Sequence, residues 1–215
     1  MKELSLNEVE LVVKTMAEVA DANEKYFSEL DAAAGDADFG VSLAKGFRII
    51  QSKWEEIDRS SIGIFLMKTG MIITSNVGGC SGPIWGTGFL RFGAKSKDKT
   101  VLTLADLVEM IDSAMEGIKA RGGAQLGDKT LLDAMAAARE VFQQWSQKQE
   151  QDFLGAFDEA AAATTATIES TRDWIAKRGR QSFTGERSKG TVDPGIVAVA
   201  TMMQAVTKAL REANP

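Results

Sequence analysis

The sequence predicts an all-α protein that forms a single domain over residues 1–215. The chain contains only three prolines, so long stretches are free to be helical, and apolar residues recur at helical spacing through most of them. No convincing segment alternates between apolar and polar residues as a half-buried strand does. The chain is long enough to close a substantial core, and 44% hydrophobic residues is usual for a soluble globular protein.

The first predicted helix begins after Ser5, because Ser5 followed three residues later by Glu8 has the pattern of a capping box. Apolar residues continue this helix to about Leu30, where the Gly- and Asp-rich stretch 31–40 interrupts it. A second helix, ending near Trp54, is predicted by three apolar residues at helical spacing: Leu43, Phe47 and Ile50.

The middle of the chain predicts three more helices. The apolar stretch 62–74 runs into a loop rich in glycine at residues 76–83. Helices are then expected over residues 84–93 and 103–120, and the second of these carries its apolar residues on one stripe. The pair Gly122 and Gly123 ends it.

The C-terminal part predicts another three helices, which brings the total to about eight. Asp128 is expected to cap a helix over residues 131–145, and a further helix is expected over residues 153–178. The last helix has Asp193 at its cap and Pro194 in its first turn, a common pair at a helix start.

Charge and composition exclude several function classes. The formal net charge of −5, with no basic stripe, argues against nucleic acid as a partner. No segment approaches the roughly 20 consecutive apolar residues that a membrane span requires. The single cysteine, Cys80, has no partner for an internal disulfide, and the N-terminus does not resemble a signal peptide. We therefore expect a cytoplasmic protein with neither a nucleic-acid nor a membrane partner.

The absence of histidine restricts the chemistry further. It removes the usual general base at neutral pH and the most frequent zinc ligand. Catalysis by this chain must therefore use carboxylates, a metal ion, lysine, arginine or the backbone.

Three aspartates, Asp31, Asp36 and Asp38, lie within eight residues at a predicted turn between helices. Like charges this close repel one another unless a cation lies between them, and hard oxygen ligands without histidine or cysteine favour Mg²⁺. Mg²⁺ in proteins usually shares its coordination with phosphates. The alternative is structural: Asp31 finishes a helix, Asp36 makes a turn and Asp38 caps the next helix.

A second loop, residues 78–82, contains three glycines with Cys80 and Ser81. Its successive backbone N–H groups and the Ser81 hydroxyl can present donors to an anion. Alternatively, the small residues let two helices cross closely. Nothing nearby in the sequence activates the Cys80 thiol, so we interpret Cys80 as a small filler and not a nucleophile.

Two further segments complete the set of candidate loops. The stretch Gly127-Asp128-Lys129-Thr130 starts a helix, and capping alone explains its Asp and Thr. The segment 178–195 carries cationic side chains that can neutralise phosphates, although a solvated surface loop explains them equally well: Arg178, Arg180, Arg187 and Lys189.

Together and in this order, the four segments resemble the nucleotide-binding L subunit (DhaL) of dihydroxyacetone kinases. The matching stretches span nearly the whole chain: GDADFG with the upstream Asp31, GGCSGPIWGT, GDKTLLDA and GERSKGTVDPG. Any one of them is a weak signal, whereas four in register make the resemblance specific.

The resemblance implies a barrel of about eight antiparallel helices with a nucleotide site in the loops at one end. It implies that Asp31, Asp36 and Asp38 hold two Mg²⁺ that bridge the phosphates of ADP or ATP. Other residues would contact the phosphates or the sugar: Phe39, Gly40, Val41, Ser42, Cys80 and Ser81. The remaining residues would border the adenine or close the pocket: Gly122, Leu131, Arg178, Asp193, Pro194 and Gly195. The resemblance does not decide whether Arg178 or Arg180 takes the arginine's place in the pocket.

The resemblance also implies one subunit of a kinase and not a complete enzyme. In the family, a histidine on a separate K-type subunit holds the ketose covalently, and this chain has no histidine. We therefore expect a K-type partner and assign no catalytic residue in this chain. The phosphoryl donor would be either ATP that exchanges freely or a phosphotransferase-system protein that rephosphorylates bound ADP, and a homodimer remains open.

Two positions depart from the family pattern. The family motif usually reads Gly-Asp-x-Asp-His-Gly, and here Phe39 replaces the histidine. Leu131 stands where a methionine is frequent, which keeps an apolar side chain against the base. Phe39 leaves a second hypothesis open, in which the chain is an ADP-dependent binding or sensor module that docks on a regulator without turnover.

Overall fold

The computed structural model describes residues 1–214, and most of them are helical, as the sequence predicts. Two short strands, β1 (Leu4–Ser5) and β2 (Val101–Leu102), pair antiparallel beside the helices. The helices, with the short 3-10 segments η1 and η2, run in this order: α1 (Leu6–Ala22), α2 (Glu24–Ala32), α3 (Phe39–Ser52), η1 (Trp54–Glu56), α4 (Ile62–Asn76), α5 (Ser81–Lys95), α6 (Leu104–Gly122), α7 (Leu131–Ser146), α8 (Phe153–Ser170), η2 (Arg180–Ser188) and α9 (Pro194–Ala213).

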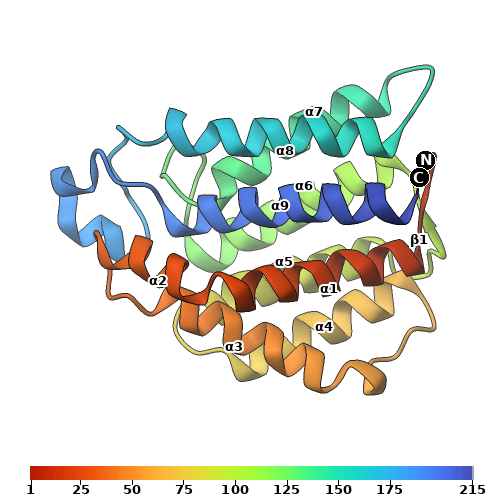
Figure 1. The fold of residues 1–215 in the computed structure, drawn as a ribbon, viewed down its shortest axis with the longest axis horizontal. Helices are drawn as coiled ribbons and strands as arrows, with labels where there is room; N and C mark the ends of the chain where they lie inside the picture. The colour runs from red at the N-terminus through yellow and green to blue at the C-terminus, as the bar shows by residue number, and fades with distance from the viewer. Residues whose placement is uncertain (215) are drawn as a thin grey trace.

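The long helices pack against one another in a closed ring (Figure 1). From α3 to α9 each helix packs on the next, and the ring closes because α1 packs on both α3 and α9. The shorter α2 lies against α3 and α9 at one end, whereas both chain termini lie at the opposite end (Figure 1). The end that carries α2 and η2 is therefore where loops from several parts of the chain meet.

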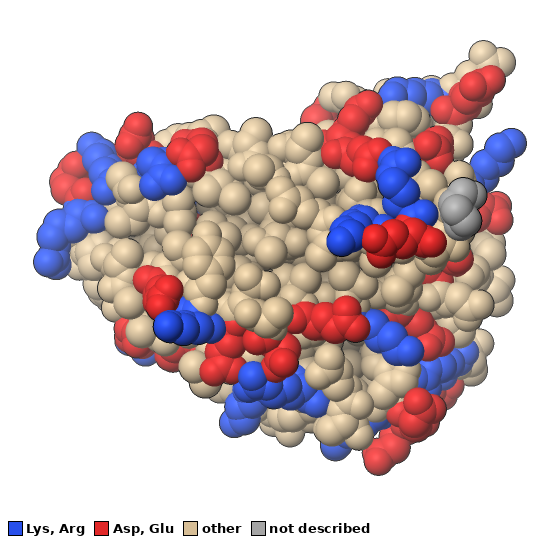
Figure 2. Space-filling view, viewed as in Figure 1, with Lys and Arg blue, Asp and Glu red and all other residues tan. Residues whose placement is uncertain are grey.

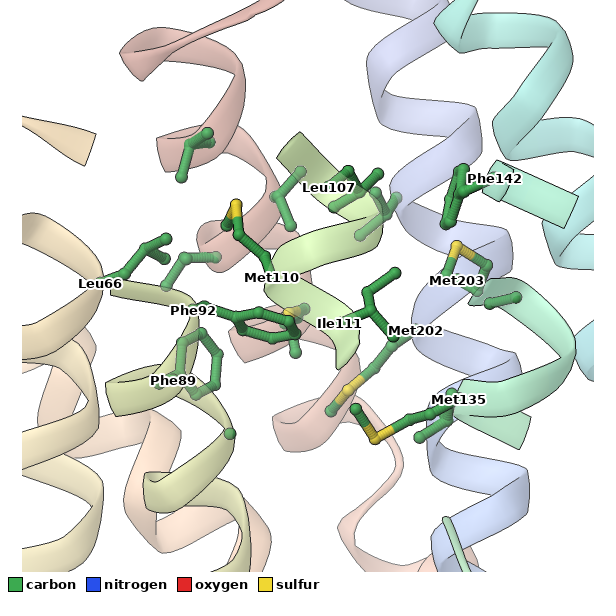
Figure 3. A pocket seen from close by; sticks show the side chains of 18 of the residues that line it. Leu66, Phe89, Phe92, Leu107, Met110, Ile111, Met135, Phe142, Met202 and Met203 are labelled. Carbon is green, nitrogen blue, oxygen red and sulfur yellow. The ribbon is translucent and has the colours of Figure 1, made fainter. Parts of the chain in front are cut away.

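An apolar cavity of about 210 Å³ lies inside the ring. Side chains from α5, α6, α7 and α9 converge on it (Figure 3), and the labelled ones include Phe89, Met110, Met135, Met202 and Met203. These walls offer no donors for phosphates and no ligands for a cation.

Hydrogen bonds at the helix starts confirm several of the predicted boundaries. Ser5 and Glu8 form the expected capping box at the start of α1. Asp193 caps α9, with its carboxylate 2.8 Å from the Ile196 nitrogen. None of the helices in residues 1–214 is both long enough and apolar enough to cross a membrane.

Two predicted helix starts and one predicted cap need correction. α3 begins at Phe39 and ends at Ser52, so it starts earlier than its apolar residues indicate. α5 begins at Ser81, earlier than predicted. Pro83 is tolerated in its first turn, because the N–H groups there have no acceptor within the helix. Asp128 does not cap α7: its carboxylate accepts from the Gln125 nitrogen, and Thr130 forms the capping box with Asp133.

Three other predictions also need correction. The expected first helix divides at Asn23, whose side-chain amide donates to the Val19 carbonyl. The helix expected to reach residue 178 ends at Ser170, and beyond its end the carbonyls of Arg172 and Trp174 accept from the Lys129 ammonium. The short strands β1 and β2 were missed, because two residues cannot show an alternating pattern.

Glycines let α4 and α5 cross closely. A Cβ atom added at Gly63 would lie 2.3 Å from the Lys97 Cα and 2.6 Å from the Gly93 carbonyl oxygen. Both are backbone atoms, which no side-chain rotation can move away.

We predict that Gly63→Ala lowers the free energy of unfolding by roughly 1–3 kcal/mol, because overpacking forces the two backbones apart. Gly88→Ala is the matched control, since its Cβ would lie at an ordinary 3.7 Å from the Ile118 Cδ1. Urea unfolding of the two variants tests this, and equal stabilities would contradict the packing argument.

Candidate functional site

The carboxylate of Asp31 is the centre of the loop that joins α2 to α3. Asp31 lies buried in the last turn of α2, and its Oδ2 accepts from the backbone nitrogens of Asp38 at 3.1 Å and Phe39 at 3.3 Å. A Cβ atom on Gly35 would lie 2.1 Å from Asp31 Oδ1, so only glycine allows the loop to pass this close. The loop therefore wraps around one carboxylate.

Asp36 and Asp38 meet Asp31 at this loop. One carboxylate oxygen from each of the three aspartates lies within 4.8 Å of the other two. Ala37 between them adopts a left-handed backbone with φ of 62°, an uncommon conformation for a residue other than glycine. The sequence prediction that these three side chains come together is consistent with this arrangement.

Asp38 does not act as a helix cap. It occupies the N-cap position of α3, but its side chain makes no capping hydrogen bond there. The structural alternative for Asp38 therefore lacks its main interaction. The carboxylate is left exposed beside the other two.

The electrostatics of the cluster favour a bound cation. Burial raises the pKa of Asp31 above its usual range. The hydrogen bond from the Phe39 backbone N–H lowers this pKa in part, and the charge of Asp36 raises it further. Burial and the charges of Asp36 and Asp31 likewise raise the pKa of Asp38. A divalent cation between the oxygens would favour the ionised carboxylates, and an all-oxygen set without histidine or cysteine suits Mg²⁺.

Arg180, which the resemblance did not separate from Arg178, is the arginine that reaches the aspartates. Its Nε lies 2.9 Å from Asp36 Oδ2, so it brings η2 onto the aspartate cluster. Arg178, the residue selected from the resemblance, instead donates from Nε to the Gly123 carbonyl at 3.0 Å. In Figure 2, basic and acidic side chains lie together at this end of the molecule. The sequence showed a cationic segment but not which arginine faces the aspartates.

The glycine-rich loop after α4 leads to the same cluster. Cys80 is exposed, so it does not fill a gap between helices as the sequence interpretation held. Partial desolvation raises the pKa of its thiol and the nearby charge of Asp38 adds to this, which favours the neutral thiol over a nucleophilic thiolate. Ser81 begins α5 and is buried. Space around Gly78 and Gly79 is open, so here glycine does not serve close helix packing.

The residues expected near the phosphates form the first turn of α3. The Phe39 ring packs on Phe27 of α2 with ring centroids 6.2 Å apart. A Cβ on Gly40 would lie 2.0 Å from the Glu24 carbonyl oxygen, which fixes α3 closely against α2. Val41 is exposed, and the Ser42 nitrogen donates to the Asp38 carbonyl. This turn carries the apolar phenyl ring of Phe39, where the resemblance leads one to expect a polar imidazole.

Of the remaining predicted residues, Asp193 and Gly195 lie beside Leu131. A Cβ added at Gly195 would lie 3.0 Å from Asp193 Oδ1 and 3.4 Å from the Leu131 Cβ, so α7 and α9 begin side by side. Leu131 also lines the apolar cavity, whereas Pro194 is buried at the start of α9. Gly122 adjoins Ile84 instead, where a Cβ would lie 2.9 Å from the Ile84 Cδ1.

Loops from distant parts of the chain thus form one polar end on an all-helical ring. The arrangement defines a class of protein: a helical domain with clustered carboxylates, an arginine and helix N-termini gathered at one end.

Comparisons with known proteins give the family. The DAK2 domain family matches residues 33–208, so the chain belongs to this family. The ADP-binding subunit DhaL of the PEP-dependent dihydroxyacetone kinase of Escherichia coli is 34% identical, over 97% of this chain and 100% of the relative. The DhaL subunit of the PTS-dependent dihydroxyacetone kinase of Lactococcus lactis is 33% identical, over 85% of this chain and 86% of the relative.

A longer relative and a solved structure extend this result. The L-erythrulose 1-kinase of Mycolicibacterium smegmatis is 32% identical, over 91% of this chain and 34% of the relative. The dihydroxyacetone kinase of C. freundii, crystallised with AMP-PNP and Mg²⁺, superposes with a TM-score of 0.69 at 26% identity, over 98% of this chain. This chain spans only 34% of that kinase. The resemblance to dihydroxyacetone kinase L subunits is confirmed.

We predict a pH-dependent effect of Asp193→Asn. Burial raises the pKa of Asp193 to about 7, above the value of about 3.9 expected in the unfolded chain. The folded state therefore binds the proton more tightly, and stability falls as pH rises from about 4 to about 7. Asn keeps a capping oxygen for the Ile196 nitrogen and carries no charge.

Urea unfolding at pH 5 and pH 8 measures this effect. The stability of Asp193→Asn relative to the unsubstituted protein should increase at pH 8. A difference that does not change with pH, or that changes in the opposite direction, would contradict the raised pKa.

Proposed function

We propose that this chain is the nucleotide-binding subunit of a dihydroxyacetone-type kinase. In this proposal it holds ADP or ATP through Mg²⁺ and passes a phosphoryl group to dihydroxyacetone, or to a related small ketose bound on a separate K-type subunit. The observation that carries the proposal is the convergence of Asp31, Asp36 and Asp38 beneath Arg180. Family membership and the nucleotide-bearing relatives support it.

The three aspartates would hold the metal, and we propose two Mg²⁺ ions there. Mg²⁺ would neutralise phosphate charge and orient the phosphates. The residues expected to meet phosphates or sugar lie at the starts of α3 and α5, where helix N–H groups favour anions: Phe39, Gly40, Val41, Ser42, Cys80 and Ser81. The residues proposed to border the base or close the pocket are Gly122, Leu131, Arg178, Asp193, Pro194 and Gly195.

Arg180 is the arginine that we propose to meet the phosphates. Its guanidinium pairs with Asp36, and a phosphate beside the aspartates would offer a second anionic partner within the same loop cluster. Phosphoryl transfer depends mainly on positioning and electrostatic stabilisation, so a chain without histidine can provide this part of the chemistry.

The partner surface would lie at the same end of the ring. Phe183 of η2 is 83% exposed and stands on the segment that carries Arg180, so it is available to a partner at this end. We propose that this surface meets the K-type subunit, with a phosphotransferase-system protein as a possible donor. We also propose that the ring of helices is the eight-helix barrel of the family. We propose a cytoplasmic location for the protein.

We predict that Asp38→Ala reduces the affinity for Mg²⁺–ADP by about 100-fold or more while the fold stays intact, because a metal ligand is lost. Titration calorimetry with ADP, with Mg²⁺ and with EDTA, measures the effect. Asp98→Ala is the matched control, since Asp98 is exposed on a loop at a distance in sequence from all four site segments. Unchanged affinity in Asp38→Ala would refute the metal assignment.

Turnover separates the kinase from the sensor hypothesis that Phe39 leaves open. We expect the chain, combined with a K-type subunit, a ketose panel and either ATP or a phosphorylated phosphotransferase-system protein, to yield sugar phosphate. If no combination gives product while ADP still changes binding to a partner protein, the kinase proposal fails and the sensor hypothesis stands.

A further inference from the structure

Lys129 is a fully buried lysine close to the candidate site. Its ammonium donates to three backbone carbonyls, those of Ser188 at 2.8 Å, Arg172 at 2.9 Å and Trp174 at 3.1 Å. An ammonium group has three N–H donors, so all of them are used. The side chain is surrounded by main-chain acceptors from one other part of the chain.

The three carbonyls belong to the two ends of a single segment, residues 172–188, which we call the anchored segment. Arg172 and Trp174 lie just after α8, and Ser188 ends η2. The two ends of the anchored segment also contact each other directly, because the Ala176 nitrogen donates to Ser188 Oγ at 2.9 Å. Lys129 therefore holds the beginning and the end of this segment together from one side.

Placing a lysine here is unfavourable in two ways. Lys129 has a φ of 63°, a left-handed conformation that glycine adopts far more readily. Burial also lowers the pKa of its ammonium. An apolar replacement would leave three carbonyls without their donor, and a polar group left unsatisfied away from water is destabilising. The hydrogen bonds of the side chain, and not the backbone conformation, therefore account for a lysine at residue 129.

The middle of the anchored segment reaches the candidate site in two places. Arg180 pairs with Asp36 of the aspartate cluster, and Arg178 donates to the Gly123 carbonyl. We propose that Lys129 is a positioning residue, whose ammonium fastens both ends of the anchored segment and thereby holds Arg180 against the aspartate cluster. The anchoring stands on the hydrogen bonds alone, whereas its effect on phosphate binding rests on the function proposed above.

Hydrogen–deuterium exchange of the full chain tests the anchoring without any ligand. In Lys129→Met, exchange within residues 172–190 should become at least about tenfold faster, because the base of the segment loses three hydrogen bonds. Helices α4 and α5 on the far side of the ring should keep their protection. Lys208→Met is the control that removes the same charge at an exposed position of α9. Unchanged exchange in residues 172–190 would overturn the proposal.

If Lys129→Met fails to fold, Lys129→Gln serves the same purpose, since its amide offers two donors and should give intermediate exchange. A double-mutant cycle then separates positioning from a general loss of stability. Affinities for Mg²⁺–ADP are measured for the unsubstituted chain, Lys129→Met, Arg180→Met and the double variant.

We expect each single substitution to weaken binding by about tenfold and the double variant to bind no more weakly than Arg180→Met. Independent, multiplying effects would show that Lys129 does not act through Arg180 and would overturn the proposal. If the unsubstituted chain does not bind Mg²⁺–ADP, the proposed function fails, and hydrogen exchange alone decides whether Lys129 anchors the segment.

Discussion

The candidate site depends on the crowding of three carboxylates around the buried end of α2. Asp31 cannot leave this position, because the nitrogens of Asp38 and Phe39 donate to it and the backbone at Gly35 passes directly beside it. The same wrapping places Asp36 and Asp38 next to Asp31 and raises the pKa of Asp31 and of Asp38. Fold and site are coupled here, since the loop that turns α2 into α3 is also the loop that concentrates negative charge.

A second set of contacts brings the C-terminal half of the chain to this loop. Arg180 provides the positive charge that the cluster lacks within its own segment, and Lys129 holds the segment that carries Arg180. The side chains of Lys129 and Arg180 have different roles. One ammonium is buried among carbonyls and shapes the backbone, whereas the guanidinium faces carboxylates at the surface. The walls of the apolar cavity inside the ring, by contrast, carry no charged groups.

The sequence was sufficient for what depends on local pattern. Helical spacing and capping residues predicted the all-α class and most helix positions, and the starts of α1 and α9 were correct to the capping residue. The aspartates were also predictable, because three carboxylates in eight residues are informative without a structure. Where a cap was assigned from residue type alone, as at Asp128, a competing turn used the side chain instead.

What sequence could not provide depends on contacts across long separations. The carbonyls just beyond the end of α8 accept from Lys129, which lies more than 40 residues earlier in the chain. The choice between Arg178 and Arg180 follows from the path of the anchored segment over the ring, which no local pattern encodes. Lys129 itself read as part of a helix start, and neither its burial nor its left-handed backbone has a sequence signal.

The central claim is that Asp31, Asp36 and Asp38 hold the metal that carries the nucleotide phosphates. A crystal structure of the chain grown with ADP and Mn²⁺ in place of Mg²⁺ tests it most directly, because anomalous scattering locates Mn²⁺ independently of any model of the ligand. The account predicts anomalous peaks between these three carboxylates and the phosphates of ADP. Peaks elsewhere, or ADP bound away from the three aspartates, would contradict it.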